Sequence, residues 1–318
     1  MTPISLRAPD GTPLVAHRSA SPPAGPWVTL VNGPSFHHVA WHHQLDYLGH
    51  RMALATWNYR GLFDSPPPAD PDAYRVPDHV GDLGAVLDAV GAPQTALLAW
   101  SLGAEIALEF LRTHPTRVTH LILINPCFGR AYARALGVPG GRHLFPATVD
   151  AARRLFPLVS RVRRRAGGWP ETTGWLKRLG FAGDTLDDDL FADVERAFRS
   201  VRVDAYLGLL RGLASYETAP PLASLAQPTL IIVGDRDRWS PLLASKRLAR
   251  ELPRGELFVV PGGTHYLPLE YPELINLRIE KFFDSHPPAE TSPAPSSTTK
   301  AAPPNPSTNG AQGKSKSS

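Results

Sequence analysis

The sequence of 318 residues predicts an α/β fold, in which a mostly parallel, doubly wound sheet is interrupted by a helical insertion and followed by a polar tail. Short apolar runs rich in β-branched residues alternate with stretches of helical periodicity. This alternation stops after Ile124 and resumes at Thr229. From His286 onward the chain contains no large apolar residue.

The predicted strands are nearly continuous apolar runs that are bounded by Gly, Pro, Asn or Asp. Such runs are typical of parallel strands, because crossover helices bury both faces of a parallel sheet. They are Trp27–Val31, Met52–Trp57, Thr95–Trp100, Val118–Ile124, Thr229–Val233 and Leu257–Val260. Apolar residues at helical spacing predict helices around residues 41–48, 80–90 and 106–111.

We divide the chain into the first part of the core (1–128), a helical cap (129–225), the second part of the core (226–285) and a disordered tail (286–318). The cap, called the insertion below, contains helix-like segments at 150–165 and 187–212. We expect the tail to be disordered because it has too little apolar surface to offset the entropy of ordering.

Composition restricts the function only weakly. The net charge of +4 is small, and the single cysteine, Cys127, cannot form an internal disulfide. The sequence has no secretory signal and no apolar run of about 18 residues, so we expect a cytoplasmic protein without a transmembrane segment. It also has no glycine-rich phosphate loop and no nucleic-acid motif, so we expect neither a cofactor nor a nucleic-acid partner.

Charged residues are unevenly distributed within the insertion. Its first half is rich in arginine, at positions 130, 134, 142, 153, 154, 161, 163, 164 and 165. Its second half is acidic, with Asp184, Asp187, Asp188, Asp189, Asp193 and Glu195. We expect the two sets to pair and to solvate the outer face. The alternative is an arginine face that contacts an acidic carrier protein or lipid.

The most informative segment is Ala96–Ala104, a predicted strand that ends in Ser101 and turns directly into a helix. A serine at such a sharp turn needs small residues two positions before and after it, and Ala99 and Gly103 meet that requirement. The helix directs its N-terminus, and the backbone N–H of Leu102, toward a developing oxyanion. Ser101 is therefore the candidate nucleophile.

A serine nucleophile needs a base, and the base needs an acid that fixes its tautomer. Both residue types occur at later strand ends, in Gly234-Asp235-Arg236-Asp237 and in Gly263-Thr264-His265. The order Ser, Asp, His, each after a strand at the same edge of the sheet, is the order found in α/β-hydrolases. Residues 27–128 and 226–284 resemble a member of that family with a helical cap, in the broad group of esterases, carbon–carbon hydrolases and cofactor-free haloperoxidases.

The resemblance implies that Ser101 is the nucleophile, His265 the general base and acid, and Asp237 the orienting carboxylate. Asp235 is the competing acid, although a turn residue that caps backbone N–H groups would also explain it. Serine at position 101 disfavours the epoxide-hydrolase and dehalogenase branches of the family, which use a carboxylate nucleophile.

Four positions depart from the family pattern. Ala99, in place of a glycine, is a sterically mild change, and Asn58 and Phe63 lie in a structural loop. The fourth is Pro34, which stands where the family has a second oxyanion donor, and proline has no N–H. Losing one donor costs about 3 to 4 kcal/mol of transition-state stabilisation. The N–H or hydroxyl of Ser35, or the side-chain amide of Asn32, would replace it, unless the reaction is not an acyl transfer.

Two tryptophans and one cysteine lie near the predicted site in the sequence. Trp100, beside the nucleophile, and Trp239, beside the acid, either line an apolar acyl pocket or serve in packing. We interpret Cys127 as a small buried residue and not as a second nucleophile.

Four histidines follow the first predicted core strand: His37, His38, His42 and His43. We expect no metal site there, because no adjacent carboxylate or thiol completes a ligand set.

The sequence thus predicts a serine hydrolase that cleaves a carboxylic ester or thioester with a hydrophobic acyl group through an acyl-enzyme. The alternatives are carbon–carbon bond hydrolysis, acyl transfer or perhydrolysis by the same triad, and a non-catalytic ligand-binding protein on the same fold. The insertion, and not the triad, would set the choice of substrate.

Overall fold

A single eight-stranded sheet organises the part of the chain that the computed structural model describes, namely residues 1–20, 25–127, 148–151, 154, 173–216 and 221–287. Six strands differ from their predicted bounds by at most two residues: β3 (Trp27–Val31), β4 (Ala53–Trp57), β5 (Thr95–Trp100), β6 (Val118–Ile124), β7 (Thr229–Gly234) and β8 (Gly255–Val260). They pair in parallel in the order β4-β3-β5-β6-β7-β8. The predicted, mostly parallel sheet is therefore confirmed.

An antiparallel hairpin that was not predicted extends one edge of this sheet. It consists of β1 (Thr2–Arg7) and β2 (Pro13–Arg18), and β2 pairs antiparallel with β4. The side chains of β1 alternate between exposed and partly buried positions. Because one face of this edge strand is solvated, it lacks the continuous apolar run that marks the central strands.

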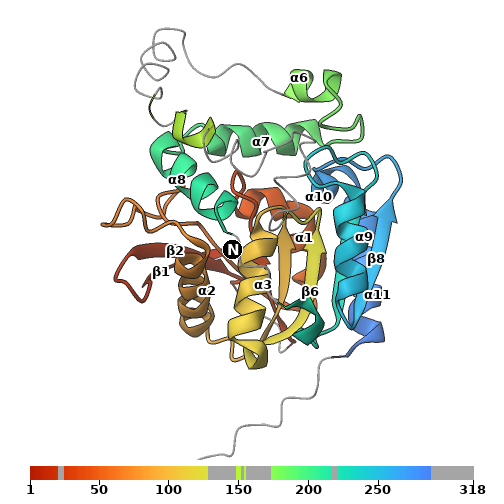
Figure 1. Cartoon of the computed structure of the whole chain (residues 1–318), viewed down its shortest axis with the longest axis horizontal. Coiled ribbons are helices and arrows are strands. Elements are labelled where there is room, and N and C mark those ends of the chain that lie inside the picture. Colours follow the sequence, from red (N-terminus) through yellow and green to blue (C-terminus); the bar gives the residue numbers. More distant parts are fainter. Residues whose placement is uncertain (21–24, 128–147, 152–153, 155–172, 217–220, 288–318) are drawn as a thin grey trace, which may run out of the picture. The chain divides into compact units, whose positions relative to one another are not determined.

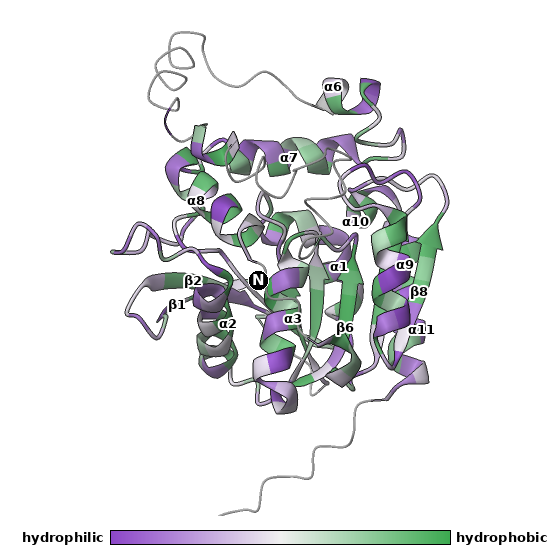
Figure 2. Cartoon of the chain, viewed as in Figure 1, coloured by the Kyte–Doolittle hydropathy of each residue, from purple (hydrophilic) through white to green (hydrophobic). Residues whose placement is uncertain are grey.

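Helices cover both faces of the sheet (Figure 1). One buried cluster joins α2 (Val76–Val90), α3 (Gly103–Thr113) and α9 (Leu242–Glu251) to the sheet. The other joins α1 (His42–Leu48), α10 (Leu267–Glu270) and α11 (Pro272–Ser285). Three short 3-10 helices complete the described body: η1 (His38–Trp41), η2 (Pro115–Arg117) and η3 (Leu222–Ser224). The strands between the two layers are largely hydrophobic, as β6 and β8 show in Figure 2.

The insertion between β6 and β7 contributes three described helices: α6 (Thr173–Arg178), α7 (Asp188–Phe198) and α8 (Val203–Ala214). The segment predicted at 187–212 is thus divided into two helices, which lie beyond one end of the sheet in Figure 1. Most of the helix predicted at 150–165, the boundary at 129 and the tail after Pro287 lie outside the described residues. None of the described helices is both long and apolar enough to cross a lipid bilayer.

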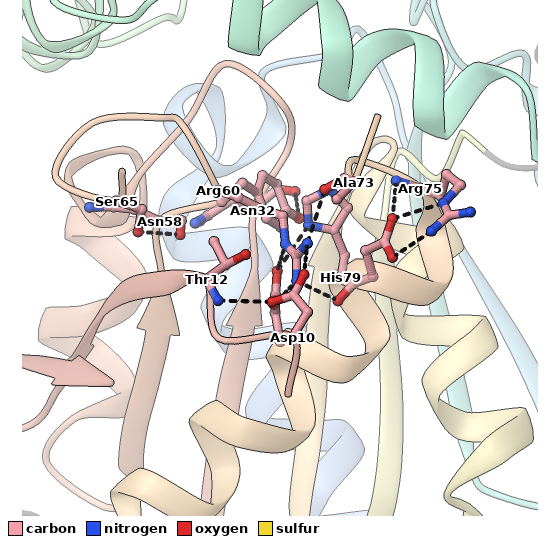
Figure 3. Close-up of polar contacts among 12 residues, drawn as sticks. Asp10, Thr12, Asn32, Asn58, Arg60, Ser65, Ala73, Arg75 and His79 are labelled. Carbon is pink, nitrogen blue, oxygen red and sulfur yellow. Dashed lines mark hydrogen bonds and ion pairs between the residues drawn. The ribbon is translucent and has the colours of Figure 1, made fainter. Parts of the chain in front are cut away.

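A buried ion pair anchors the loop after β4 (Figure 3). Arg60, which is only 1% exposed, donates from Nε and Nη2 to both carboxylate oxygens of Asp82, at 2.8 and 2.7 Å. Its Nη1 donates to Asp10 at 2.7 Å. The adjacent Tyr59 donates its hydroxyl to the carbonyl oxygen of Asn32 at 2.6 Å. The loop that the ion pair anchors therefore contacts, through Tyr59, the segment after β3 that begins with Asn32.

Candidate active site

Ser101 lies in a sharp turn between β5 and α3. Its φ angle is 58°, in the left-handed region that residues other than glycine rarely adopt. The turn is fixed by hydrogen bonds from the Ser101 N–H to the Ile124 carbonyl at 3.0 Å and from the Cys127 N–H to the Ser101 carbonyl at 3.1 Å. A Cβ atom at Gly103 would lie 2.6 Å from the carbonyl oxygen of Asn32. Only glycine fits there without a shift of the backbone.

Three side chains from different strand ends meet at this turn. His265 Nε2 lies 2.9 Å from Ser101 Oγ, and His265 Nδ1 lies 2.8 Å from Asp237 Oδ2. All three residues are buried. The other oxygen of Asp237 accepts from the backbone N–H groups of Trp239 and Ser240, at 2.7 and 2.9 Å. The arrangement has the geometry of a nucleophile, a base and an orienting carboxylate.

Asp235, the competing acid, has a different environment. Its Oδ1 accepts from the N–H of Gly262 at 2.8 Å, and its own N–H donates to the carbonyl of Val260 at 3.2 Å. No hydrogen bond joins it to His265 within the described part of the chain. Asp235 therefore caps the turn after β8, as a turn residue would.

Asn125 holds the strand ends together and was not singled out in the sequence. Its Nδ2 donates to the carbonyl of Thr264 at 2.8 Å, and its Oδ1 accepts from the N–H of Gly234 at 3.0 Å. It thus ties the end of β6 to β7 and to the loop that carries His265. A buried amide directly after an apolar strand, at the edge that bears Ser101, is the signal that could have identified it.

Glu270 on α10 connects the His265 loop with the insertion. Its carboxylate accepts from the N–H and the hydroxyl of Thr264, at 2.8 and 2.5 Å, and from the N–H of Gly183 at 2.7 Å. Thr264 directly precedes His265, and Gly183 lies in the insertion. No local pattern in the sequence distinguishes this glutamate from the others.

A cavity of about 440 Å³ lies beside Ser101. The body contributes Leu102, Cys127 and His265 to its described wall. Helices α7 and α8 contribute mainly apolar side chains: Phe191, Val194, Phe198, Tyr206 and Leu210. A concave, mostly apolar wall with a few convergent polar groups is typical of a small-molecule site.

The turn after β3 borders both the nucleophile and the cavity. The N–H of Phe36 donates to the carbonyl of Gly33 at 3.1 Å, which puts Pro34 at the second position of a four-residue turn, where its fixed φ is favourable. Pro34 and Ser35 both line the cavity. A Cβ atom at Gly33 would lie 3.5 Å from the Cβ of Ser101. This turn is therefore close enough to contribute a group to the reaction.

The side chain of Asn32 is directed away from the cavity and is fully engaged in the core. Its Oδ1 accepts from Trp41 Nε1 at 2.7 Å, and its Nδ2 donates to the carbonyl of Trp57 at 2.8 Å and to Thr56 Oγ1 at 3.3 Å. The amide therefore has no free donor for an oxyanion. Of the two expected replacements for the missing N–H, only Ser35 lies at the cavity.

Of the two tryptophans considered for substrate contact, only Trp239 lines the cavity. Trp100 is fully buried and stacks on Phe36, with the ring centroids 4.1 Å apart. Its Nε1 donates to the backbone carbonyl of His265 at 2.9 Å. These contacts agree with the packing alternative for Trp100, since Phe36 and not Trp100 is among the residues that line the cavity.

Cys127 lies beside the candidate nucleophile, with Sγ 3.9 Å from Ser101 Oγ. It is buried, and burial raises the pKa of its thiol far above the ordinary value. A thiol that stays protonated is a poor nucleophile. This environment agrees with the interpretation of Cys127 as a small buried residue.

The histidines on α1 pair separately with carboxylates. His42 Nε2 lies 3.5 Å from Asp46, and His43 Nε2 lies 3.2 Å from Asp187 of the insertion. Within the described ranges, no group of three or more His, Cys, Asp and Glu side chains is arranged to hold a metal ion.

The other two histidines stack in a row with a third from β2. The ring centroids of His37 and His38 are 4.8 Å apart, and those of His38 and His17 are 4.3 Å apart. Burial and the neighbouring imidazoles lower the pKa of His17 and of His37 to about 4. These rings are therefore neutral near pH 7.

Three residues of the acidic half of the insertion have described partners, and these lie outside the arginine-rich half. Asp187 contacts His43, Asp188 contacts Lys177 at 2.6 Å, and Asp193 contacts Arg196 at 2.7 Å. Of the nine arginines only Arg154 is among the described residues. The predicted pairing of the two sets, and the alternative contact with a carrier or lipid, fall outside the described residues.

Residues 26–272 match the family model described as alpha/beta hydrolase fold. The chain is 28% identical over 304 residues to epoxide hydrolase 3 from Siraitia grosvenorii, covering 83% of this chain and 94% of that protein. It is 27% identical over 209 residues to 2-hydroxymuconate semialdehyde hydrolase from Pseudomonas putida, covering 62% and 65%. The fold is similar to that of the esterase EaEST from Exiguobacterium antarcticum, with a TM-score of 0.71, 19% identity and coverage of 88% and 98%. The chain therefore belongs to the alpha/beta hydrolase fold family.

Proposed function

We propose that the protein is a serine hydrolase that cleaves a carboxylic ester or thioester with a hydrophobic acyl group. The proposal rests on the two hydrogen bonds that join Ser101 to His265 and His265 to Asp237, at 2.9 and 2.8 Å. The positive φ of Ser101 adds support, because a strained turn of this kind presents the nucleophile at the end of a strand. The apolar wall of the adjacent cavity supports the hydrophobic acyl group.

In the acylation step, His265 Nε2 takes the proton of Ser101 Oγ as this oxygen attacks the substrate carbonyl carbon. Asp237 holds the imidazole in the required tautomer and stabilises its protonated form. His265 then gives the proton to the departing alcohol or thiol, and the acyl group remains on Ser101. Water, deprotonated by His265, attacks the acyl-enzyme, releases the acid and restores Ser101.

Two donors stabilise the oxyanion in this scheme. The first is the backbone N–H of Leu102, which precedes α3 and has no hydrogen-bond acceptor in the described part of the chain. The second comes from Ser35, because Pro34 has no N–H and the side-chain amide of Asn32 is already bonded in the core.

The identity of the nucleophile also favours an acyl substrate over an epoxide. Attack of a serine hydroxyl on an epoxide carbon would form an ether, which water does not readily cleave. A carboxylate nucleophile would form an ester, which water can cleave. Ser101 therefore supports ester hydrolysis, in spite of the similarity to epoxide hydrolase 3.

Hydrolysis of a carbon–carbon bond by the same triad is the second candidate. It is favoured by the similarity to a protein named as a hydrolase of 2-hydroxymuconate semialdehyde, a molecule that contains no ester bond.

The proposed function is tested by covalent labelling with a fluorophosphonate, with Ser101→Ala as the control. We expect one label at Ser101 in the wild type and none in the variant. A panel of p-nitrophenyl esters and acyl thioesters of increasing chain length measures the acyl pocket in the same proteins. Labelling or hydrolysis that is equal in wild type and Ser101→Ala would overturn the proposal. Turnover of 2-hydroxymuconate semialdehyde without turnover of any ester would favour the second candidate.

A further inference from the structure

Tyr206 of α8 contacts the turn in which the expected oxyanion donor is missing. Its hydroxyl oxygen lies 2.9 Å from Ser35 Oγ, although the two residues are 171 positions apart in the sequence. Both side chains line the cavity that contains Ser101. The insertion and the turn after β3 thus meet through a pair of hydroxyl groups at the candidate site.

We propose that the hydroxyl groups of Ser35 and Tyr206 act as a relay that replaces the backbone donor removed by Pro34. Tyr206 donates its proton to Ser35 Oγ, and the hydroxyl proton of Ser35 is then free to bind the oxyanion that forms at Ser101. Ser35 is a catalytic residue in this scheme, and Tyr206 is a positioning residue. The inference rests on the proposed function, because the oxyanion arises only when Ser101 attacks a carbonyl.

The direction of the hydrogen bond between the two hydroxyls decides whether the relay can work. A hydroxyl group donates one hydrogen bond only. If Ser35 donated to Tyr206, it would have no proton left for the oxyanion. Burial raises the pKa of the Tyr206 phenol, so this group stays protonated and able to donate. A donor that itself accepts a hydrogen bond is also polarised into a stronger donor.

Close packing on α8 fixes the position of Tyr206, as a preorganised donor requires. A Cβ atom at Gly208 would lie 2.8 Å from the ring of Tyr74, and one at Gly212 would lie 1.9 Å from the carbonyl oxygen of Tyr74. The ring of Phe198 meets the Tyr206 ring edge-on, with the centroids 5.0 Å apart. The phenol is thus held by its surroundings and not by the bond to Ser35 alone.

The experiment compares Ser35→Ala, Tyr206→Phe and the double variant, with Tyr47→Phe as a control that loses a tyrosine hydroxyl on α1, outside the cavity. We expect Ser35→Ala to lower kcat/KM about 100-fold, through kcat, because removal of one oxyanion donor has an effect of that size. Tyr206→Phe should lower it about tenfold, and the double variant should equal Ser35→Ala, because Tyr206 acts only through Ser35. Tyr47→Phe should stay close to wild type.

A trifluoromethyl ketone distinguishes this role from a purely structural one. Such an inhibitor forms a tetrahedral adduct with an oxyanion on the nucleophile, so its Ki should rise in parallel with the loss of kcat/KM while KM for the ester stays constant. A change confined to KM would overturn the relay.

Three further outcomes would contradict the inference. The first is a Ser35→Ala variant with nearly unchanged kcat/KM, and the second is a double variant in which the losses of kcat/KM add. The third is a Tyr206→Phe variant with a lower kcat/KM than Ser35→Ala, which would indicate that the tyrosine donates directly to the oxyanion. Failure of the proposed function has a different signature. If Ser101→Ala is inactive and Ser35→Ala fully active, only the relay is wrong, whereas an active Ser101→Ala rejects both.

Discussion

The indole nitrogen of Trp100 donates a 2.9 Å hydrogen bond to the backbone carbonyl of His265. The residue that precedes the proposed nucleophile thereby supports the residue proposed as its base. Because Trp100 is the last residue of β5 and is fully buried, this bond gives the His265 loop a rigid point of attachment. The imidazole is therefore positioned by the core of the protein as well as by Asp237.

We expect Trp100→Phe to lower kcat about fivefold with little change in KM, because the loop loses a hydrogen bond worth about 1 kcal/mol. Steady-state kinetics on a p-nitrophenyl ester would measure both constants. Trp239→Phe is the matched control, since Trp239 lines the cavity and should affect KM more than kcat. The reverse pattern in the two variants would contradict the assigned roles.

Replacing each of the two aspartates after β7 by asparagine should have very different effects on kcat. Asp237→Asn should lower kcat by about 10⁴-fold, because an amide stabilises the wrong tautomer of His265. Asp235→Asn should cost less than tenfold, because its side-chain oxygen can still accept the N–H of Gly262. Ester hydrolysis by the two purified variants measures this difference. A larger loss in Asp235→Asn would exchange the two assignments.

The buried ion pair of Arg60 predicts a large effect on stability. Asp82→Asn removes the carboxylate that the guanidinium binds through two hydrogen bonds, and should lower the free energy of unfolding by about 3 to 5 kcal/mol. Asp10→Asn changes a partner whose side chain is 43% exposed, and should cost less than about 1 kcal/mol. Urea unfolding followed by circular dichroism provides both values. Equal losses would show that burial does not control the strength of this network.

The stacked histidines predict a loss of stability in mild acid. The pKa of His17 is lowered from its ordinary value of 6.5 to about 4 by burial and by the neighbouring imidazoles. Between these values the unfolded chain binds more protons than the folded chain, so the free energy of unfolding falls as pH drops from about 6.5 toward about 4. Above pH 6.5 the group is neutral in both states and contributes no dependence.

Urea unfolding at pH 7.5 and at pH 5 would measure this contribution in wild type and in His17→Phe. We expect the variant to lose less stability between the two pH values, because it lacks one of the groups that titrate differently in the two states. His42→Gln, in which an exposed histidine is replaced, should behave as wild type. An identical pH dependence in wild type and His17→Phe would contradict the prediction.

The central sheet could be predicted from the sequence because its strands are buried on both faces. β5 and β6 begin and end at the predicted residues. The edge hairpin of β1 and β2 could not, since β1 alternates between exposed and partly buried side chains and the apolar run of β2 is only three residues long. The division of residues 187–212 into two helices was also missed, because the apolar stripe of α7 gives no sign of where the chain changes direction.

In the candidate site, too, the residues that could be predicted are those with a signal in the neighbouring sequence. The turn at Ser101 and the strand-end positions of Asp237 and His265 each follow from a few neighbouring residues. Glu270 and Tyr206 could not be assigned in this way, because their partners are far away in the chain and are brought together only by tertiary packing. The boundary at 129 and the disorder of the tail stay predictions.

The carboxylate of Glu270 binds the backbone of the His265 loop at Thr264 and that of the insertion at Gly183. In engineering terms, the insertion is not an interchangeable module. A chimera that imports a different insertion to alter substrate preference would also change the support of the loop that carries His265. Transplants that keep an N–H donor at the position of Gly183 are the ones in which specificity can be changed without loss of rate.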